Sequence, residues 1–246
     1  MVNMPAARQA VEFIKKLPAL GAGIHLNLFE GEPVSKDPCV ACLLGADGKF
    51  AYSPSRLSFL SVPRRSIRNA IATELAAQIQ WAIDNGLQPT HLDSHKHIHS
   101  FPVIFDIICY LAKSFRIGAI RWLFEPDSVC RKPWPAPGEG GKKKAGILRV
   151  MARINRWQNR SFLKTKAVLG IAHTGRIDTE FLKAAILHNL TGPVEIITHP
   201  GFTNGLDRTK TRLLHQRKTE LDALCDRNIK QYFNEAGIQL VHYGQI

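Results

Sequence analysis

The chain has 246 residues, 45% of them hydrophobic, and a formal net charge of +13 at pH 7. This length and apolar content are enough for a large core, and they exclude a wholly disordered chain. No apolar run is long enough to span a membrane, the N-terminus lacks the layout of a signal peptide, and the five scattered cysteines favour a cytoplasmic protein with reduced thiols.

Hydrophobic periodicity predicts alternating helices and strands along the first half of the chain. The predicted helices cover residues 5–17, 67–83 and 100–115, with Gly86 ending the second and Ser100 capping the third. The predicted strands cover residues 21–28, 90–93 and 118–126, and residues 31–63 are expected to be a loop.

The second half begins with a Pro-, Gly- and Lys-rich segment, which is typical of a mobile excursion. We place this basic excursion at about residues 127–166, with a basic helix in its later part. On that helix Arg149, Arg153, Arg156 and Arg160 share one stripe, and Ile147, Val150, Ile154 and Trp157 share another. Further helices are predicted at 178–190, 209–224 and 229–236, and strands at 168–175, 193–201 and 238–244.

This alternation predicts an α/β fold with a mainly parallel sheet, in one domain that covers residues 1–246. In such folds, functional side chains gather at the carboxyl ends of strands. Three polar groups occupy such positions here: His25 with Asn27 in "GIHLNL", the run "HLDSHKHIHS" at 91–100, and His199 in "ITHPGF".

The run at 91–100 holds four histidines and one aspartate, and several interpretations are open. Imidazole and carboxylate groups suit Zn, Mn or Fe, or Mg where oxygen ligands dominate. A histidine-rich surface tract is the main rival, because a lone strand histidine such as His25 or His199 is more often a hydrogen-bonded structural residue. Not all four histidines can bind the same ion. Residues two positions apart share a face only while the backbone is extended, and the chain must turn into a helix near Ser100.

The pair Cys39 and Cys42 forms a C-x-x-C, but no second pair of ligands follows at the spacing of a zinc site. The basic charge is concentrated: residues 140–177 contain ten Lys or Arg and no Asp or Glu. This segment is either a solvated helix face or a surface for an anionic partner. A non-catalytic protein that binds a membrane surface or nucleic acid is therefore the alternative function, although no nucleic-acid motif is present.

The stretches "GIHLNLFEGEPV", "PTHLDSHKHIHSFPVIFDI" and "ITHPGF" resemble the motifs of the YdjC-like carbohydrate deacetylases, the ChbG/HpnK family. The match in order and spacing covers essentially the whole chain, and the D-S-H-x-H-x-H block is its specific part. "GIAHTGRID" and "IQLVHYG" are most similar to the branch associated with hopanoid biosynthesis.

The resemblance implies a distorted (β/α) TIM-like barrel and hydrolysis of an N-acetyl group on an amino sugar, as an oligosaccharide or lipid-linked. It implies one divalent metal ion, Mg or Zn, with His25 and His95 as ligands. His199 would be catalytic, near the substrate carbonyl or the leaving amine. Asn27, Asp93, His97 and Arg121 would contact substrate or orient the ligands, with Asp93 and His97 orienting His95 or its loop. For Arg121, which lies on a predicted strand, a structural ion pair is an equal alternative. A homodimer is implied by family likeness only.

Family members begin with a strand that ends in an Asp-Asp-Phe-Gly motif, which supplies a metal ligand and the catalytic base. This chain resembles the family only after that strand and its helix, and its first aspartate is Asp37. We therefore expect a barrel that lacks its first strand and helix, from truncation or from true loss. Because removing a catalytic base typically costs about 10²- to 10⁴-fold in rate, we expect weak activity or none.

Overall fold

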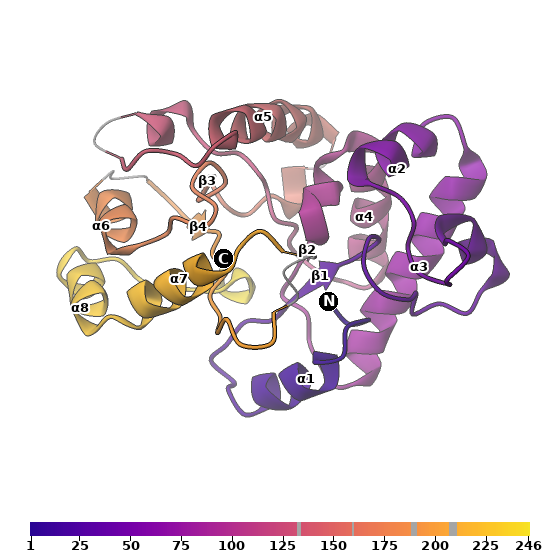
Figure 1. The fold of residues 1–246 in the computed structure, drawn as a ribbon, viewed down its shortest axis with the longest axis horizontal. Helices are drawn as coiled ribbons and strands as arrows, with labels where there is room; N and C mark the ends of the chain where they lie inside the picture. Colours follow the sequence, from indigo (N-terminus) through magenta and orange to yellow (C-terminus); the bar gives the residue numbers. More distant parts are fainter. Residues whose placement is uncertain (132–133, 159, 188–190, 207–210) are drawn as a thin grey trace. The chain divides into compact units, whose positions relative to one another are not determined.

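The computed structural model describes residues 1–131, 134–158, 160–187, 191–206 and 211–246. The chain divides into two compact units. The first unit comprises Met1–Arg121, Ile154–Lys164 and His242–Ile246, and the second comprises Trp122–Arg153 and Thr165–Val241. Figure 1 shows the elements in chain order, with parallel strands and many helices, so the α/β prediction is confirmed.

Two short parallel strands lie within the first unit. They are β1 (Gly23–Leu26) and β2 (His91–Ser94), paired so that His25 lies opposite Asp93. A single parallel bridge joins Leu92 to Ile120. The helical segments of this unit are α1 (Ala7–Lys15), η1 (Pro38–Leu43), α2 (Pro54–Ser61), α3 (Arg65–Asp84), η2 (His95–Ser100), α4 (Pro102–Ser114), η4 (Arg160–Phe162) and η5 (Tyr243–Gln245).

The core of the first unit forms where α3 and α4 pack beside these strands. Ile71, Leu75 and Ile79 recur every four residues on α3 and are fully buried, as the helical period requires. Ile24 and Leu26 of β1 join the same core. Successive strand side chains point to opposite faces, so His25 is directed away from this apolar side.

The second unit contains the parallel strands β3 (Ala167–Leu169) and β4 (Val194–Ile196). Its core includes the fully buried Phe181. The helical segments that complete the chain are η3 (Asp127–Cys130), α5 (Gly141–Gln158), α6 (Thr179–Leu187), α7 (His215–Cys225) and α8 (Arg227–Glu235). The boundary between the units falls within α5, after Arg153.

The predicted barrel is not confirmed, because in the described ranges the strands form two two-stranded sheets and no closed barrel is seen. The strand predicted at 118–126 is reduced to the bridge at Ile120. The strand predicted at 238–244 is wrong: residues 238–242 have no regular structure, and Leu240 and Val241 are exposed. Alternating apolar residues make a strand only where a neighbouring strand completes the ladder.

The loop predicted at 31–63 is also partly wrong, because it contains η1 and α2. Asp37 accepts a hydrogen bond from the Cys39 backbone, and Ser53 accepts one from the Arg56 backbone, so each segment has a capping side chain. The residue before α4 is Phe101 and not the predicted cap Ser100. Gly86 does follow α3 with a positive φ of 85°.

The excursion predicted at about 127–166 contains η3, α5 and η4, so most of it is helical. Its residues 132–133 and 159 lie outside the described residues. Residues 188–190 of the helix predicted at 178–190 also lie outside the described residues, as do residues 209–210 of the helix predicted at 209–224. Residues 211–214 of the latter prediction are described and are not helical. Arg149 is buried, so it does not belong to an exposed basic stripe.

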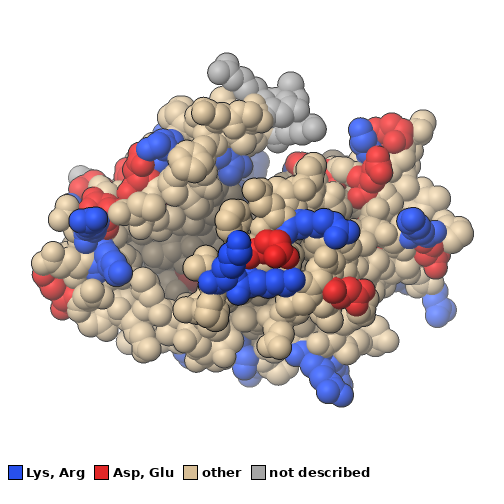
Figure 2. Space-filling model, turned by 90° about the horizontal axis from the view of Figure 1, so that it is seen from below, with Lys and Arg blue, Asp and Glu red and all other residues tan. Residues whose placement is uncertain are grey.

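Charged side chains of both signs are scattered over the face drawn in Figure 2, where Lys and Arg lie among Asp and Glu and most of the surface belongs to other residues. Among the described residues no helix combines the length and the apolar character that crossing a membrane requires.

Candidate functional site

A cluster of polar side chains lies where β1 and β2 run side by side in the first unit. His25 on β1 and Asp93 on β2 are register partners, and their side chains meet with His25 Nδ1 2.8 Å from Asp93 Oδ2. His95 follows β2 directly, and its ring centroid lies 5.8 Å from that of His25 in an edge-on arrangement. The pairing of two strands therefore brings together the two histidines that the sequence singled out.

Asp93 is a buried carboxylate with two partners on the same oxygen. Arg121 forms an ion pair with Oδ2, and His25 shares that oxygen. Burial opposes ionisation, but Arg121 and His25 outweigh it and hold the pKa of Asp93 far below its ordinary value. Asp93 is therefore ionised near neutral pH and accepts a hydrogen bond from His25 Nδ1–H, which leaves Nε2 as the ring nitrogen directed away from this carboxylate.

His95 has its own carboxylate partner, Glu30, whose Oε1 lies 2.9 Å from His95 Nε2. Lys96 Nζ lies 3.8 Å from the same oxygen and 5.5 Å from the centroid of the Phe29 ring. Burial lowers the pKa of His95, and Glu30 opposes this effect. A neutral imidazole is the form that binds metal ions and transfers protons.

Glu30 is positioned by a turn that Asn27 organises. The side-chain oxygen of Asn27 accepts hydrogen bonds from the backbones of Phe29 and Glu30, at 3.0 and 3.2 Å. Its amide nitrogen donates to the Glu30 carbonyl at 2.7 Å. Gln78 of α3 in turn bonds both backbone groups of Asn27. Asn27 is fully buried, so it supports the turn that presents Glu30.

The remaining histidines of the run 91–100 have different surroundings. His91 stacks on Tyr243 with a centroid distance of 4.2 Å. His97 is half-buried and, with Lys96, has a positive φ, so the chain reverses sharply after His95. His99 is buried against Ser94, whose hydroxyl lies 2.6 Å from His99 Nδ1. Of these four, His95 is the one that makes the ring contact with His25 described above.

His25 and His95 match the chemistry of two metal ligands. Each has one ring nitrogen on a carboxylate, which is how proteins orient ligating imidazoles, and each keeps its other nitrogen available. The described residues contain no group of three or more His, Cys, Asp or Glu arranged to hold an ion. The pair is thus a partial donor set, and a third protein ligand is not found in the described part of the chain.

His199 belongs to the second unit, in the loop that follows β4. Its backbone N–H donates to Oε2 of Glu220, a fully buried residue of α7. Burial raises the pKa of Glu220, while hydrogen bonds from the backbones of His199, Ile177 and Gly175 oppose this effect. Glu220 therefore ties the His199 loop to the segment after β3.

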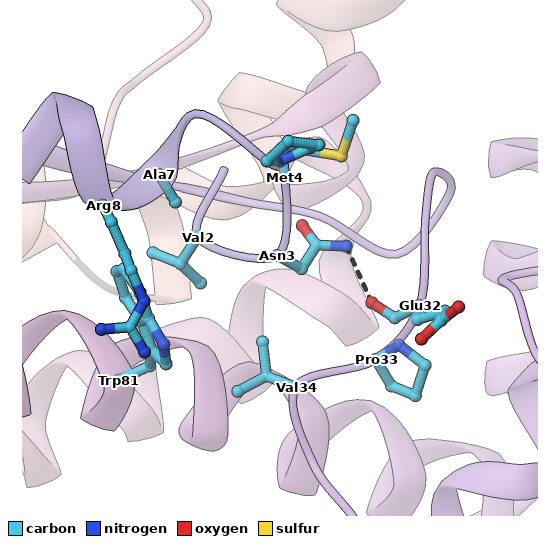
Figure 3. A pocket seen from close by; sticks show the side chains of 10 residues that line it. Val2, Asn3, Met4, Ala7, Arg8, Glu32, Pro33, Val34 and Trp81 are labelled. Atoms are coloured by element: carbon cyan, nitrogen blue, oxygen red, sulfur yellow. Dashed lines mark hydrogen bonds between the residues drawn. The ribbon is translucent and has the colours of Figure 1, made fainter.

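A separate pocket of about 470 Å³, open to solvent, lies at the start of the chain. Figure 3 shows Asn3 in this pocket, with its amide directed to the backbone of Glu32, and Trp81 and Val34 on the opposite wall. The side-chain oxygen of Asn3 also accepts from Asn27 Nδ2 at 3.0 Å. Neither His25 nor His95 lines this pocket, but Asn3 connects it to the turn that carries Glu30.

Sequence reasoning missed two carboxylates, Glu30 and Glu220. Glu30 lies inside the quoted motif "GIHLNLFEGEPV", five residues after His25, where a turn signal of Asn followed by Gly31 was present. Glu220 gave no signal, because a glutamate in a charged helix is normally solvated. Asp93 was expected to orient His95 or its loop, and the contacts of its side chain are with His25 and Arg121.

Comparison with known proteins shows the family of the chain. The model of the YdjC-like protein family matches residues 1–235. The chain belongs to the YdjC-like family. A carbohydrate deacetylase of Brevibacillus brevis is 30% identical over 246 residues, which are 100% of this chain and 86% of that protein.

A second relative of this YdjC-like protein is a chitooligosaccharide deacetylase of Salmonella paratyphi B. It is 31% identical over 242 residues, which cover 96% of this chain and 82% of that protein. A solved structure from Enterococcus faecalis superposes with a TM-score of 0.71 at 20% identity, over 99% of this chain and 84% of that one. This likeness shows that the two chains share a fold.

Proposed function

We propose that this YdjC-like protein is a metal-dependent hydrolase that removes an N-acetyl group from an amino sugar. Family membership and the two deacetylase relatives support this proposal. The structural observation that carries it is the pair of adjacent imidazoles, His25 and His95, each with one ring nitrogen hydrogen-bonded to a carboxylate.

In this proposal His25 and His95 hold one divalent ion, Mg or Zn. Bound there, the ion would polarise the acetyl carbonyl and lower the pKa of a water molecule. The side chains of the chain keep these two ligands in place and in the correct protonation state. Asp93, fixed by Arg121, holds the proton of His25 on Nδ1, and Glu30 holds that of His95 on Nε2.

His199 is our candidate for the acid that protonates the departing amine, a step that typically contributes about 10²- to 10⁴-fold to the rate. Glu220 accepts a hydrogen bond from the backbone N–H of His199 and so fixes the position of the backbone that carries the imidazole. Asn27 contributes by shaping the Glu30 turn, and His97 by the sharp reversal that follows His95.

Several finer expectations remain part of this proposal. They are the TIM-like barrel, the branch associated with hopanoid biosynthesis, a lipid-linked or oligosaccharide substrate, and a homodimer. Two imidazoles alone bind a divalent ion weakly, so we expect added metal to increase the rate.

The test is acetate release from N-acetylated chitooligosaccharides, measured with added Zn²⁺ or Mg²⁺ and with a chelator. The chelator and His95→Ala should each reduce the rate by about 10²-fold or more, because an orienting contact alone is worth about 10- to 100-fold. Glu30→Gln should weaken metal affinity by about 10- to 100-fold. His215→Ala, which removes an exposed histidine of α7, is the matched control and should retain full activity. Acetate release that survives both the chelator and His95→Ala would contradict the proposal.

A further inference from the structure

Helix α5 carries an apolar stripe on the side that faces away from the protein core. Ile147, Val150, Ile154 and Trp157 are 50%, 51%, 44% and 84% exposed. They are spaced three, four and three residues apart, which places them on one face of a helix. The opposite face, with Ala145, Leu148 and Ala152, is buried. One apolar face of α5 therefore packs in the protein and the other meets solvent.

Basic side chains surround this stripe. Helix α5 has no acidic residue, and Lys142, Lys143, Arg153 and Arg156 are exposed along it. The whole segment 140–177 has ten Lys or Arg and no Asp or Glu. The face drawn in Figure 2 is different, because there the two signs are interspersed. Arg149 is the exception on α5, since it is buried and paired with Asp127.

We propose that the exposed face of α5 docks on an anionic lipid surface. A helix with Trp and aliphatic side chains on one face, flanked by Lys and Arg, lies in the plane of a membrane interface. The aliphatic side chains enter the boundary between headgroups and acyl chains, and the cations meet the lipid phosphates. Trp157 is suited to this depth because its ring is apolar and its N–H is polar.

Charge complementarity favours lipid over the other occupants of this face. A second copy of the chain would bring two acid-free basic segments together, which like-charge repulsion opposes. Nucleic acid would satisfy the cations, but phosphate contacts leave the four apolar side chains in water. An anionic bilayer satisfies both the cations and the apolar stripe.

The experiment measures binding to large vesicles of phosphatidylcholine, with and without phosphatidylglycerol, at low and at physiological salt. We expect binding to the anionic vesicles that weakens with salt, and much weaker binding to the neutral ones. Lys142→Gln/Lys143→Gln should weaken it by about thirtyfold, at about fivefold per charge. Trp157→Ala should weaken it by about tenfold or more.

Matched variants separate this face from general effects. Phe59→Ala removes an exposed aromatic ring from α2, and Lys36→Gln/Lys49→Gln removes two exposed charges outside 140–177. Both should bind vesicles like the wild type. Anionic vesicles should also shift the tryptophan emission to shorter wavelength, and Trp157→Phe should lose that shift while still binding.

The proposal is overturned if the α5 variants bind anionic vesicles as tightly as the wild type. It is also overturned if the protein binds no vesicle at low salt. Binding of a DNA duplex in place of vesicles would then identify nucleic acid as the partner, and a dimer that Trp157→Ala disperses would identify a second copy of the chain. These readouts do not involve hydrolysis, so lipid binding and the proposed deacetylase activity can fail separately.

Discussion

His99 is a buried imidazole that the protein keeps neutral. Burial lowers its pKa to about 3, with Asp93 opposing the shift and Arg121 adding to it. The unfolded chain takes up this proton near the ordinary pKa of 6.5. The contribution of His99 to stability is therefore complete above about pH 6.5 and is lost as the pH falls toward 3.

We predict that His99→Asn makes the unfolding free energy less dependent on pH. Below about pH 6 one such proton steepens the loss of stability by up to about 1.4 kcal/mol per pH unit. Urea unfolding at about pH 7 and about pH 5 would measure the difference. His215→Asn, which replaces an exposed histidine in the same way, serves as the control for the substitution itself. Equal slopes for the wild type and His99→Asn would show that His99 is not held neutral.

The proximity of His25 and His95 was predictable because both follow a simple rule, that polar residues at the ends of parallel strands gather at one edge. Which carboxylate each histidine meets was not predictable. The choice depends on strand register for Asp93, and on a turn closed by Asn27 for Glu30. Each of the two histidine–carboxylate contacts joins residues that are more than sixty positions apart in the chain.

The turn between β2 and α4 places two non-glycine residues in the left-handed region, Lys96 with φ 53° and His97 with φ 57°. A side chain in that region costs roughly 1–2 kcal/mol. Glycine has no such cost, so at this position it should be favoured over alanine, which is the reverse of the order in a helix.

We therefore expect Lys96→Gly to be more stable than Lys96→Ala by about 1 kcal/mol. Comparing these two variants cancels the contacts that Lys96 makes with Glu30 and Phe29. The control pair is Gln80→Gly and Gln80→Ala, within α3, where glycine should be less stable by about 1 kcal/mol. Thermal unfolding would measure both differences. The same sign at the two positions would mean that the turn is not strained.

Helices were predicted better than strands, and the reason is physical. A long amphipathic helix such as α3 contains its own backbone partners, so its local period is sufficient. A strand needs a neighbouring strand to complete its hydrogen bonds. Among the described residues, the segment 118–126 has only the bridge at Ile120, and the segment 238–244 has no strand pairing. The η1 and α2 segments were missed although Asp37-Pro38 and Ser53-Pro54 carried the signal of a capped start.

The two units have separate hydrophobic cores. Phe105 of α4 is buried in the core of the first unit, and Phe181 of α6 in a core of the second. Proteins open locally in cooperative units, which usually correspond to such contiguous packed regions. A cavity in one core should therefore lower the protection of the backbone amides around that core first.

We predict that Phe105→Ala and Phe181→Ala, each of which typically costs about 3–5 kcal/mol, produce two different patterns of native-state hydrogen exchange. Phe105→Ala should accelerate exchange in α3, α4 and β2, because these elements share its core. Phe181→Ala should accelerate exchange in α6 and in β3 and β4. Each variant is the control for the other, since residue type and burial are the same. If either substitution accelerates exchange equally in both sets of elements, the chain unfolds as one cooperative body and the two cores are energetically coupled.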